Sequence, residues 1–279
     1  MKFKVKFVYC NLIIFILILL CVLIIKNSQN NKLIVKEQDF KLNNSNSSFL
    51  FCIILTKFDN LNTKTKTIYE TWASKCDNYR FILTLPNNII ENSNTSKGIE
   101  LNINYMNILQ PPNYTSERYN ALTDKIFLTL NYLFINDYYK RYKWYLKADD
   151  DSFIFVNNLR DFLSTKNSSL PVTYGYDYKL YVQMGYHSGG AGYVLSNEAF
   201  NRLGSILNKN YSFCENNGIE DVDVALCLRK LQVYPNKSID DFGRERFHPV
   251  DLVSSFRGDF LTKMPWLNEY ALNPIQFVR

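Results

Sequence analysis

The sequence predicts an α/β domain behind a single N-terminal transmembrane helix. Short apolar runs typical of buried strands alternate along the chain with segments of helical periodicity, which favours a sheet flanked by helices. The run from residue 7 to residue 25 carries no charge and is long enough, as a helix, to cross a bilayer. A polar stretch comes next, and the roughly 230 residues after it suffice for one domain with a large core.

The charges around the apolar run predict its orientation. Lys2, Lys4 and Lys6 precede it, and lysines are sparser after it, which favours a cytoplasmic N-terminus. We therefore expect a cytoplasmic tail (1–6), a transmembrane signal-anchor (7–25), an Asn/Ser/Lys-rich stem (26–48) and a lumenal domain (49–279). A cleaved signal peptide is the alternative, but the run exceeds a typical h-region and no small-x-small site follows it. The net charge of +6 partly reflects these lysines, so we expect no nucleic-acid partner.

The first part of the lumenal domain reads as strand, helix, strand. Residues 49–56, "FLFCIILT", form an apolar β-rich run, and residues 79–85, "YRFILTL", form a second. Between them, residues 63–75 have helical periodicity with Trp72 on the apolar face.

A polar segment and a long helix follow. Residues 87–113 are Asn-rich and contain Pro111-Pro112, so we expect a loop around one short strand near 99–105. A long helix is expected over 117–137 from the helical spacing of its apolar residues, which are Leu122, Ile126, Leu130, Leu133 and Phe134. The next strand is "KWYLKA", residues 143–148.

Three aspartates, Asp149 to Asp151, stand at the carboxyl end of that strand, where α/β sheets bind ligands. In extended backbone, Asp149 and Asp151 would share a face while Asp150 points away. Carboxylate oxygens suit Mg²⁺ or Mn²⁺, and a departing diphosphate accumulates charge that a metal or several basic groups must offset. An EF-hand calcium loop is excluded. With Asp149 as its first position, Phe153 and Ile154 would stand at the fifth and sixth positions, where a ligand and a glycine belong. A solvated acidic turn is the alternative.

Two downstream segments could complete a site. "GYHSGGAGYVLS", residues 185–196, contains glycines that would let a ligand approach the backbone, although a tight turn before a helix starting near Ser196 also explains it. Glu220 and Asp221 stand at the start of an amphipathic helix, where one carboxylate could act as a general base. Complementing the helix macrodipole is the alternative.

The cysteines and sequons are consistent with an oxidising, secretory compartment. Cys52, Cys76, Cys214 and Cys227 lie outside the membrane segment and allow three disulfide pairings, of which the local one closes the shortest loops. A zinc site is disfavoured because no C-x-x-C pair occurs. Glycosylation sequons begin at Asn43, Asn46, Asn94, Asn113, Asn167, Asn210 and Asn236.

Four motifs together resemble the animal core-1 β1,3-galactosyltransferases of glycosyltransferase family 31. They are "WYLKADDDSFIFVNNLRDFL", "GYHSGGAGYVLSNEAFNRL", "IEDVDVALCL" and "GRERFHPV", and the match runs from about residue 51 to residue 274. The resemblance implies a Golgi type II membrane enzyme of GT-A fold, with a mixed, mainly parallel sheet. It also implies inverting, Mn²⁺-dependent transfer of galactose from UDP-galactose to the 3-hydroxyl of N-acetylgalactosamine on Ser or Thr of glycoproteins. Homodimerisation is plausible from the family.

The resemblance also implies roles for particular residues. Asp221 would be the general base, Asp149 and Asp151 the metal carboxylates, and Trp266 and Tyr270 acceptor-binding aromatics. The disulfides would be Cys52–Cys76 and Cys214–Cys227. Nucleotide-binding positions would be Leu55, Lys125, Lys147, Asp149, Asp150, Gly189 and Gly190.

Some family features are absent from the 279 residues. The family's "V-S-F-H-Y" segment, whose histidine completes the metal shell, is not found, and Asn268 replaces a second tryptophan. The only histidines are His187, which replaces a family methionine, and His248, in the "F-H-P" match. These departures leave two alternatives: a non-catalytic homologue that binds or helps to fold a partner transferase, and a family 31 transferase with another UDP-sugar donor.

Overall fold

The computed structural model describes residues 35–37, 48–90, 95–257 and 260–274. None of the helices in these ranges has the length and hydrophobicity needed to cross a bilayer. The transmembrane segment predicted at 7–25, and most of the stem predicted at 26–48, lie outside the described residues.

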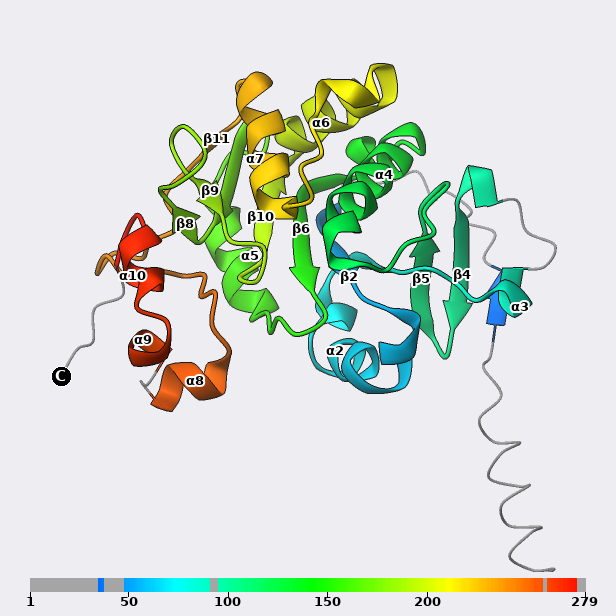
Figure 1. The fold of residues 1–279 in the computed structure, drawn as a ribbon, viewed down its shortest axis with the longest axis horizontal. Helices are drawn as coiled ribbons and strands as arrows, with labels where there is room; N and C mark the ends of the chain where they lie inside the picture. Colours follow the sequence, from blue (N-terminus) through cyan, green and yellow to red (C-terminus); the bar gives the residue numbers. More distant parts are fainter. Residues whose placement is uncertain (1–34, 38–47, 91–94, 258–259, 275–279) are drawn as a thin grey trace, which may run out of the picture.

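A nine-stranded mixed sheet forms the centre of the fold, in the order β1-β4-β5-β3-β2-β6-β10-β7-β11 (Figure 1). The neighbours β5, β3, β2 and β6 run parallel, whereas β10 is antiparallel to both β6 and β7. A separate two-stranded sheet pairs β8 with β9. The strands are β1 (Val35–Glu37), β2 (Ser48–Leu55), β3 (Asn78–Ile82), β4 (Ile99–Ile103), β5 (Met106–Gln110), β6 (Tyr142–Asp149), β7 (Val172–Gly175), β8 (Asp177–Tyr178), β9 (Tyr186–His187), β10 (Tyr193–Ser196) and β11 (Tyr234–Pro235).

Helices cover both faces of the sheet, with α4, α6 and α7 on one face and α2 and α5 on the other (Figure 1). The α-helices are α2 (Lys66–Thr71), α3 (Asn87–Ile90), α4 (Leu122–Ile135), α5 (Val156–Ser164), α6 (Asn197–Lys209), α7 (Glu220–Lys230), α8 (Leu252–Arg257), α9 (Phe260–Lys263) and α10 (Trp266–Tyr270). The short 3-10 turns are η1 (Phe58–Asn60), η3 (Ala73–Lys75), η4 (Thr95–Lys97), η5 (Tyr119–Ala121), η6 (Tyr138–Lys140) and η7 (Tyr211–Phe213), and η2 (Leu61–Thr65) is one π-helical turn.

Strand β2 shows why the sheet is buried on both sides. Its alternate residues Leu50, Cys52 and Ile54 belong to one hydrophobic core, and Phe51, Ile53 and Leu55 belong to the other. A continuous apolar run is the pattern expected of a strand covered on both faces. The predicted first strand is therefore confirmed, and the mixed sheet with flanking helices agrees with the predicted α/β class.

Two predicted elements differ from the structure. The segment 63–75 is not one helix but η2, α2 and η3 in succession, and Trp72 is buried at the C-cap of α2. The segment 87–113 contains a second strand, β5, which pairs antiparallel with β4. Asn104 and Tyr105 form the two-residue turn with φ of 49° and 68°. Asn-Tyr is a rare choice for such a turn, so the usual Asn-Gly signal was missing.

Other boundaries agree with expectation. Helix α6 begins directly after Ser196, whose side chain accepts a hydrogen bond from the Ala199 N–H as an N-cap. The long helix predicted at 117–137 is shorter, because residues 119–121 form a 3-10 turn before α4 begins.

Candidate active site

The aspartate triplet lies where the parallel strands β2 and β6 end side by side. Asp149 is the last residue of β6 and pairs in register with Leu55, the last residue of β2. Asp150 and Asp151 belong to the turn after β6, which the Ser152 N–H closes by donating to the Asp149 carbonyl. The expectation that alternate side chains share a face is wrong here, because the extended backbone stops at Asp149.

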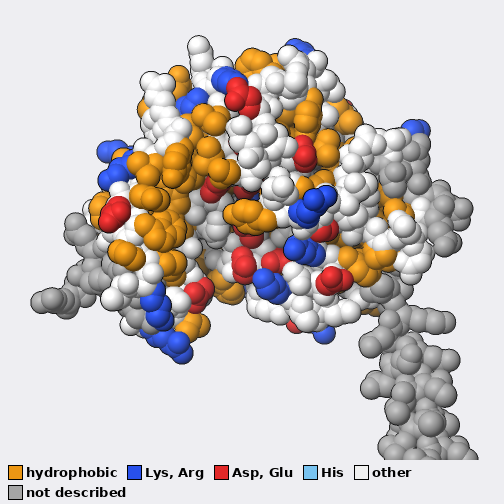
Figure 2. Space-filling view, in the orientation of Figure 1, with side chains coloured by type: hydrophobic (Ala, Val, Ile, Leu, Met, Phe, Trp, Pro, Cys, Tyr) orange, Lys and Arg blue, Asp and Glu red, His pale blue; other side chains and the backbone are white. Residues whose placement is uncertain are grey.

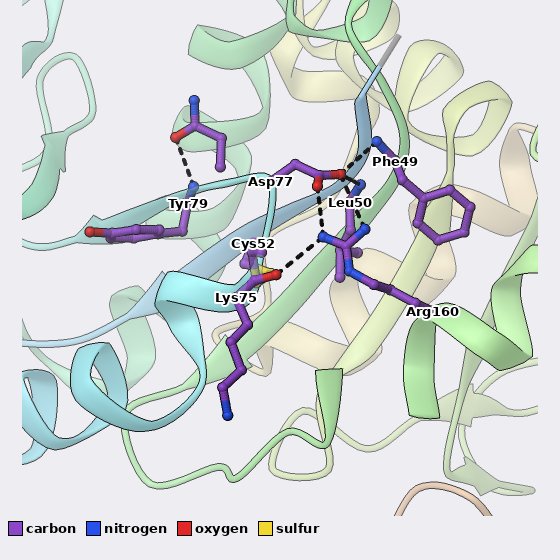
Figure 3. Close-up of a disulfide and its surroundings, with 9 residues drawn as sticks. Phe49, Leu50, Cys52, Lys75, Asp77, Tyr79 and Arg160 are labelled. Atoms are coloured by element: carbon purple, nitrogen blue, oxygen red, sulfur yellow. Dashed lines mark hydrogen bonds and ion pairs between the residues drawn. A yellow bond between two sulfur atoms is a disulfide. The ribbon is translucent and has the colours of Figure 1, made fainter. Parts of the chain in front are cut away.

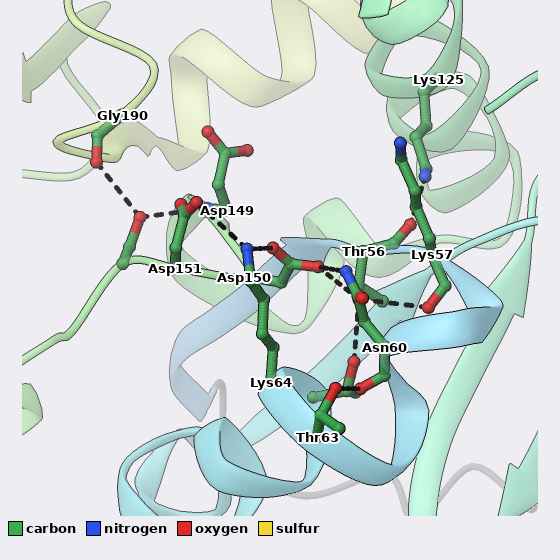
Figure 4. Close-up of polar contacts among 12 residues, drawn as sticks. Thr56, Lys57, Asn60, Thr63, Lys64, Lys125, Asp149, Asp150, Asp151 and Gly190 are labelled. Atoms are coloured by element: carbon green, nitrogen blue, oxygen red, sulfur yellow. Dashed lines mark hydrogen bonds and ion pairs between the residues drawn. The ribbon is translucent and has the colours of Figure 1, made fainter. Parts of the chain in front are cut away.

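Asp150 is fixed by the loop after β2. Its Oδ2 accepts hydrogen bonds from Thr56 Oγ1 at 2.9 Å and from Asn60 Nδ2 at 2.6 Å (Figure 4). Thr56 Oγ1 also lies 2.8 Å from the hydroxyl of buried Thr65. One carboxylate oxygen is thus fully occupied inside the protein, which leaves Oδ1 to face outward.

Lys64, in η2, places its ammonium between the two aspartates of the turn. Its Nζ lies 3.3 Å from Asp150 Oδ1 and 3.4 Å from Asp151 Oδ2, while the Asp149 carboxylate points elsewhere (Figure 4). Partial burial alone would lower the pKa of Lys64, but the attraction of Asp150 and then Asp151 outweighs it and raises that pKa. These two carboxylates already gather around one cation.

Lys147, also from β6, is a buried cation that connects the triplet to helix α7. Its Nζ lies 2.9 Å from Asp149 Oδ1 and 3.0 Å from Glu220 Oε2, and it donates to the Gly189 carbonyl at 3.3 Å. Burial alone would lower the pKa of Lys147, but Glu220 and Asp149 outweigh it and raise that pKa. Tyr193 donates to Glu220 Oε1 at 2.6 Å. Burial raises the pKa of Glu220, an effect that Lys147 partly offsets.

Asp221 occupies the first turn of α7, next to the glycine segment. Its Oδ2 accepts the Gly189 N–H at 2.9 Å, and its Oδ1 accepts the Val222 N–H at 2.9 Å. The side chain of Asp221 is partly exposed, whereas Glu220 is buried. The two neighbouring carboxylates therefore have different surroundings, with Glu220 facing Lys147 and Asp221 beside Gly189.

Two glycines of this segment, Gly189 and Gly192, are closely packed. A Cβ on Gly189 would lie 3.1 Å from Glu220 Oε2 and 3.3 Å from Lys147 Nζ. Gly192 has a φ of +72°, and a Cβ there would lie 2.9 Å from the Lys147 carbonyl. Gly190 is more open, and its carbonyl accepts a hydrogen bond from Ser152, which ties the segment to the acidic turn.

The remaining predicted nucleotide-binding residues are internal. Leu55 has its side chain in the core, so that only its backbone could meet a ligand. Lys125, from α4, is buried and donates to the Thr56 carbonyl at 2.5 Å and to Glu117 at 2.7 Å. Burial lowers the pKa of Lys125, and Glu117 partly offsets this. Lys125 thus holds the loop that carries Thr56.

Trp266 and Tyr270 lie on α10 and are joined to the region of Asp221 by other aromatic rings. The Trp266 ring lies 5.6 Å from that of Tyr270 and 6.3 Å from that of Tyr178 in β8. Tyr186 in β9 lies 5.4 Å from Tyr178. Burial, and after it the charge of Asp221, raises the pKa of Tyr186, and β9 packs against α7, the helix that carries Asp221.

Both predicted disulfides are present, Cys52–Cys76 and Cys214–Cys227. The first ties β2 to the end of η3, beside the ion pair of Asp77 and Arg160 at 2.7 Å (Figure 3). The second ties the segment before α7 to its third turn, so it restrains the helix that carries Asp221.

Several residues of the site were missed by sequence reasoning. Lys64, Thr56 and Asn60 hold the acidic turn, and nothing in their spacing pointed to it. Asp223 is fully buried, and its carboxylate accepts from Thr123 Oγ1, the N–H groups of residues 217 and 219 and the Asn217 amide, so it fixes the start of α7. The only signal of this role in the sequence was the "D-V-D" spacing, which places the two aspartates on different sides of a helix.

The two histidines do not join the aspartate triplet. His187 is buried, with Nδ1 2.6 Å from Asp177 and Nε2 2.8 Å from Thr173 Oγ1. His248 is exposed and lies in the segment after β11. Within the described ranges, no group of three or more His, Cys, Asp or Glu side chains is gathered as a metal site.

Comparisons with known proteins identify a family and several similar proteins. The family described as Fringe-like matches residues 47–251. Glycoprotein-N-acetylgalactosamine 3-beta-galactosyltransferase 1 of Xenopus laevis is 28% identical across 81% of this chain and 58% of its own length. Beta-1,3-glucosyltransferase of Mus musculus is 34% identical across 36% of this chain and 20% of its own length. Human chondroitin sulfate synthase 3 is 31% identical across 38% of this chain and 13% of its own length.

The chain thus spans less than two thirds of the length of these relatives. Among solved structures, the apo-form glycosyltransferase GlyE of Streptococcus pneumoniae aligns with a TM-score of 0.41 and 11% identity, covering 82% of this chain and 53% of that one. The resemblance inferred from the four motifs is confirmed by the family match and by the Xenopus relative.

Proposed function

This chain belongs to the Fringe-like family, and we propose that it is an inverting glycosyltransferase of GT-A type that transfers galactose from UDP-galactose to the 3-hydroxyl of N-acetylgalactosamine on glycoproteins. The Xenopus relative supports this choice of sugar and acceptor. The observation that carries the proposal is the connection through Lys147, which joins Asp149 at the acidic turn to Glu220, the neighbour of Asp221. The buried Lys147 thus connects the proposed donor site to the helix that carries the proposed general base.

The acidic turn would hold the donor together with Mn²⁺. The chemistry of the donor set fits a hard divalent cation, because it offers carboxylate oxygens, with Asp151 already beside the Lys64 ammonium and Asp149 beside that of Lys147. Asp149 and Asp151 would bind the metal, which, when bound, neutralises charge on the diphosphate leaving group. The exposed Gly190 would let the nucleotide approach the backbone, whereas Gly189 is buried and its N–H and carbonyl are held by Asp221 and Lys147.

Asp221 would act on the acceptor. A new bond forms between the acceptor O3 and the anomeric carbon of galactose, while the bond from that carbon to the diphosphate oxygen of UDP breaks. The O3 proton passes to a carboxylate oxygen of Asp221, which raises the nucleophilicity of the hydroxyl. Attack opposite the leaving group inverts the anomeric carbon. The Gly189 N–H fixes the orientation of the Asp221 carboxylate for this transfer.

We propose that the reaction takes place in the Golgi lumen, with residues 7–25 as a type II signal-anchor. The two disulfides support an oxidising compartment, because such bonds persist in secretory proteins and are rare in the cytosol. Trp266 and Tyr270 would bind the acceptor sugar, since an aromatic face can pack on a pyranose ring.

The test is galactose transfer by the full chain in isolated membranes. Wild type, Asp221→Asn and a control, Asp241→Asn, are incubated with UDP-galactose, Mn²⁺ and a peptide that carries N-acetylgalactosamine on threonine. Asp241 is exposed and outside the contacts described above. We expect transfer by the wild type and the control, and a loss of 100-fold or more, roughly the contribution of a general base, in Asp221→Asn.

Other results would redirect the proposal. Absence of transfer by a folded wild-type chain that still binds the glycopeptide would favour the non-catalytic homologue. Transfer from a different UDP-sugar in a donor panel would keep the mechanism and change the donor. Full activity in Asp221→Asn would refute the assignment of the base.

A further inference from the structure

The loop between β8 and β9 presents two large apolar side chains to solvent from an unusual backbone. Tyr181 and Met184 are 72% and 59% exposed. Both have left-handed φ values, 62° and 65°, which cost free energy for residues other than glycine. Between them Val182 is buried in the core, so the loop is anchored while the two side chains point outward. Such strain in an ordered loop is typical of functional segments.

The loop is fixed to the two elements that carry the proposed acceptor chemistry. Arg229, on α7, donates from Nε to the Gln183 carbonyl at 3.0 Å and from Nη2 to the Gly185 carbonyl at 2.9 Å. The Lys179 N–H donates to the Tyr270 carbonyl, on α10, at 2.8 Å. Helix α7 also carries Asp221. The loop therefore keeps a set position relative to the base and to the aromatic residues of α10.

Gly185 makes the tight return of this loop possible. Its φ is +82°, and a Cβ would lie 2.4 Å from the Tyr178 carbonyl. The Gly185 N–H donates to the Val182 carbonyl at 2.8 Å, which closes the turn under Met184. The exposure of Tyr181 and Met184 thus follows from a specific backbone course and not from a loosely packed tip.

Tyr181 extends the aromatic row outward. Its ring lies 6.3 Å from that of Tyr186, which in turn contacts Tyr178, the neighbour of Trp266. Hydrophobic side chains gather over β8, β9 and α10, beside a hollow in which acidic side chains are visible (Figure 2). The row therefore runs from the proposed sugar-binding aromatics to the exposed loop.

We propose that Tyr181 and Met184 determine acceptor specificity by contacting the polypeptide on either side of the glycosylated residue; this inference rests on the proposed function. The acceptor sugar is bonded to a Ser or Thr of the polypeptide. When the 3-hydroxyl of that sugar lies beside Asp221, the polypeptide must therefore lie about one sugar ring away from the base. The apolar loop at the outer end of the aromatic row fits apolar residues of that polypeptide. Acidic flanking residues gain nothing from Tyr181 and Met184 and are disfavoured by this surface.

The variants Tyr181→Asn and Met184→Asn test the proposal without disturbing the backbone, because asparagine tolerates the left-handed region. Tyr105→Asn is the matched control. Tyr105 is also a tyrosine with positive φ, 68°, and 67% exposed, but it lies in the β4–β5 turn near the other edge of the sheet. Two acceptors are compared with the full chain in membranes: methyl α-N-acetylgalactosaminide, and a glycopeptide with apolar residues beside the modified threonine.

For the glycopeptide, we expect KM to rise about tenfold in the loop variants with kcat unchanged, as for the loss of a contact worth about 1.4 kcal/mol. For the methyl glycoside, kcat/KM should stay within about twofold of wild type, and Tyr105→Asn should match wild type with both acceptors. An equal loss with both acceptors, or no loss with the glycopeptide, overturns the inference while transfer by the wild type still supports the proposed function.

A binding measurement separates the two hypotheses if transfer fails. The glycopeptide is labelled with a fluorophore, and its anisotropy is followed with increasing amounts of detergent-solubilised full chain. Wild-type binding that weakens about tenfold in Tyr181→Asn supports the loop even without catalysis. Absence of glycopeptide binding by a folded wild type, or equal binding by Tyr181→Asn, overturns it.

Discussion

Lys147→Met is expected to destabilise the chain far more than the same substitution at an exposed ion pair. The Lys147 and Glu220 side chains are only 3% and 6% exposed, and their charged atoms lie 3.0 Å apart. Removing the cation leaves Glu220 buried beside Asp149 without a counter-charge. Breaking a buried pair in this way costs about 3–5 kcal/mol, whereas an exposed pair contributes about 0–1 kcal/mol.

The matched control is Lys230→Met, in the same domain. Lys230 Nζ lies 2.6 Å from Glu215, and the two side chains are 41% and 63% exposed. For a domain of this size, 1 kcal/mol shifts the melting temperature by about 2–4 °C. We therefore expect a drop of about 10 °C for Lys147→Met and of about 3 °C or less for the control. The assay heats the full chain in mild detergent and measures the fraction that resists proteolysis.

The loss of stability in Lys147→Met should depend on pH in a defined direction. The folded-state pKa of Lys147 is raised, so its contribution is fully present below the ordinary value of 10.5 and is lost only as pH rises through the higher folded pKa. Without Lys147, the raised pKa of Glu220 rises further, and the buried carboxyl is neutral in acid. The variant should therefore recover toward wild type as pH falls toward 4.5, the ordinary pKa of a glutamate. Equal melting shifts in Lys147→Met and Lys230→Met would refute the reasoning.

Four further variants have defined outcomes. Lys64→Gln removes the ammonium from the acidic turn, so Mn²⁺ measured by electron paramagnetic resonance without nucleotide should bind about fivefold more tightly; unchanged or weaker binding would contradict the fit of the turn to a cation. Gly189→Ala should lower the melting temperature because its Cβ crowds Glu220, whereas Gly190→Ala, with its nearest neighbour at 3.9 Å, should not. Arg160 and backbone N–H groups outweigh burial and lower the pKa of Asp77, so Asp77→Asn should lose stability at pH 7. This loss should shrink as pH falls below 3.8 and through the lower folded pKa, and melting curves recorded at pH 7 and in acid would test it.

The sequence predicts the strands of the parallel centre well, because burial on both faces leaves a plain apolar signal in β2 and β6. It misses β5, because the hairpin turn at Asn104-Tyr105 lacks the glycine that usually marks such turns. It also predicts one helix where η2, α2 and η3 follow one another, since periodicity alone does not separate these forms.

The sequence predicts the site residues that stand together in the chain, but not those that come from distant segments of it. The triplet and the "I-E-D-V-D" segment are visible as runs of acidic residues. Lys64, Thr56 and Asn60 come from the loop after β2, more than 80 positions before the triplet, and only the parallel pairing of β2 with β6 brings them to Asp150. No local sequence pattern predicts these contacts, because they depend on the strand order of the sheet.

Helix α7 explains why two adjacent carboxylates can have separate tasks. Consecutive helical residues point about 100° apart, so Glu220 faces inward to Lys147 and Tyr193 while Asp221 lies beside Gly189 at the surface of the site. The inner carboxylate is buried and is engaged by a cation and a hydroxyl, so an acceptor cannot reach it. Asp221 is partly exposed and is held by N–H donors alone. Exchanging the pair, with Glu220→Asp and Asp221→Glu together, should therefore lower the melting temperature and abolish transfer, whereas Asp221→Glu alone should affect only transfer.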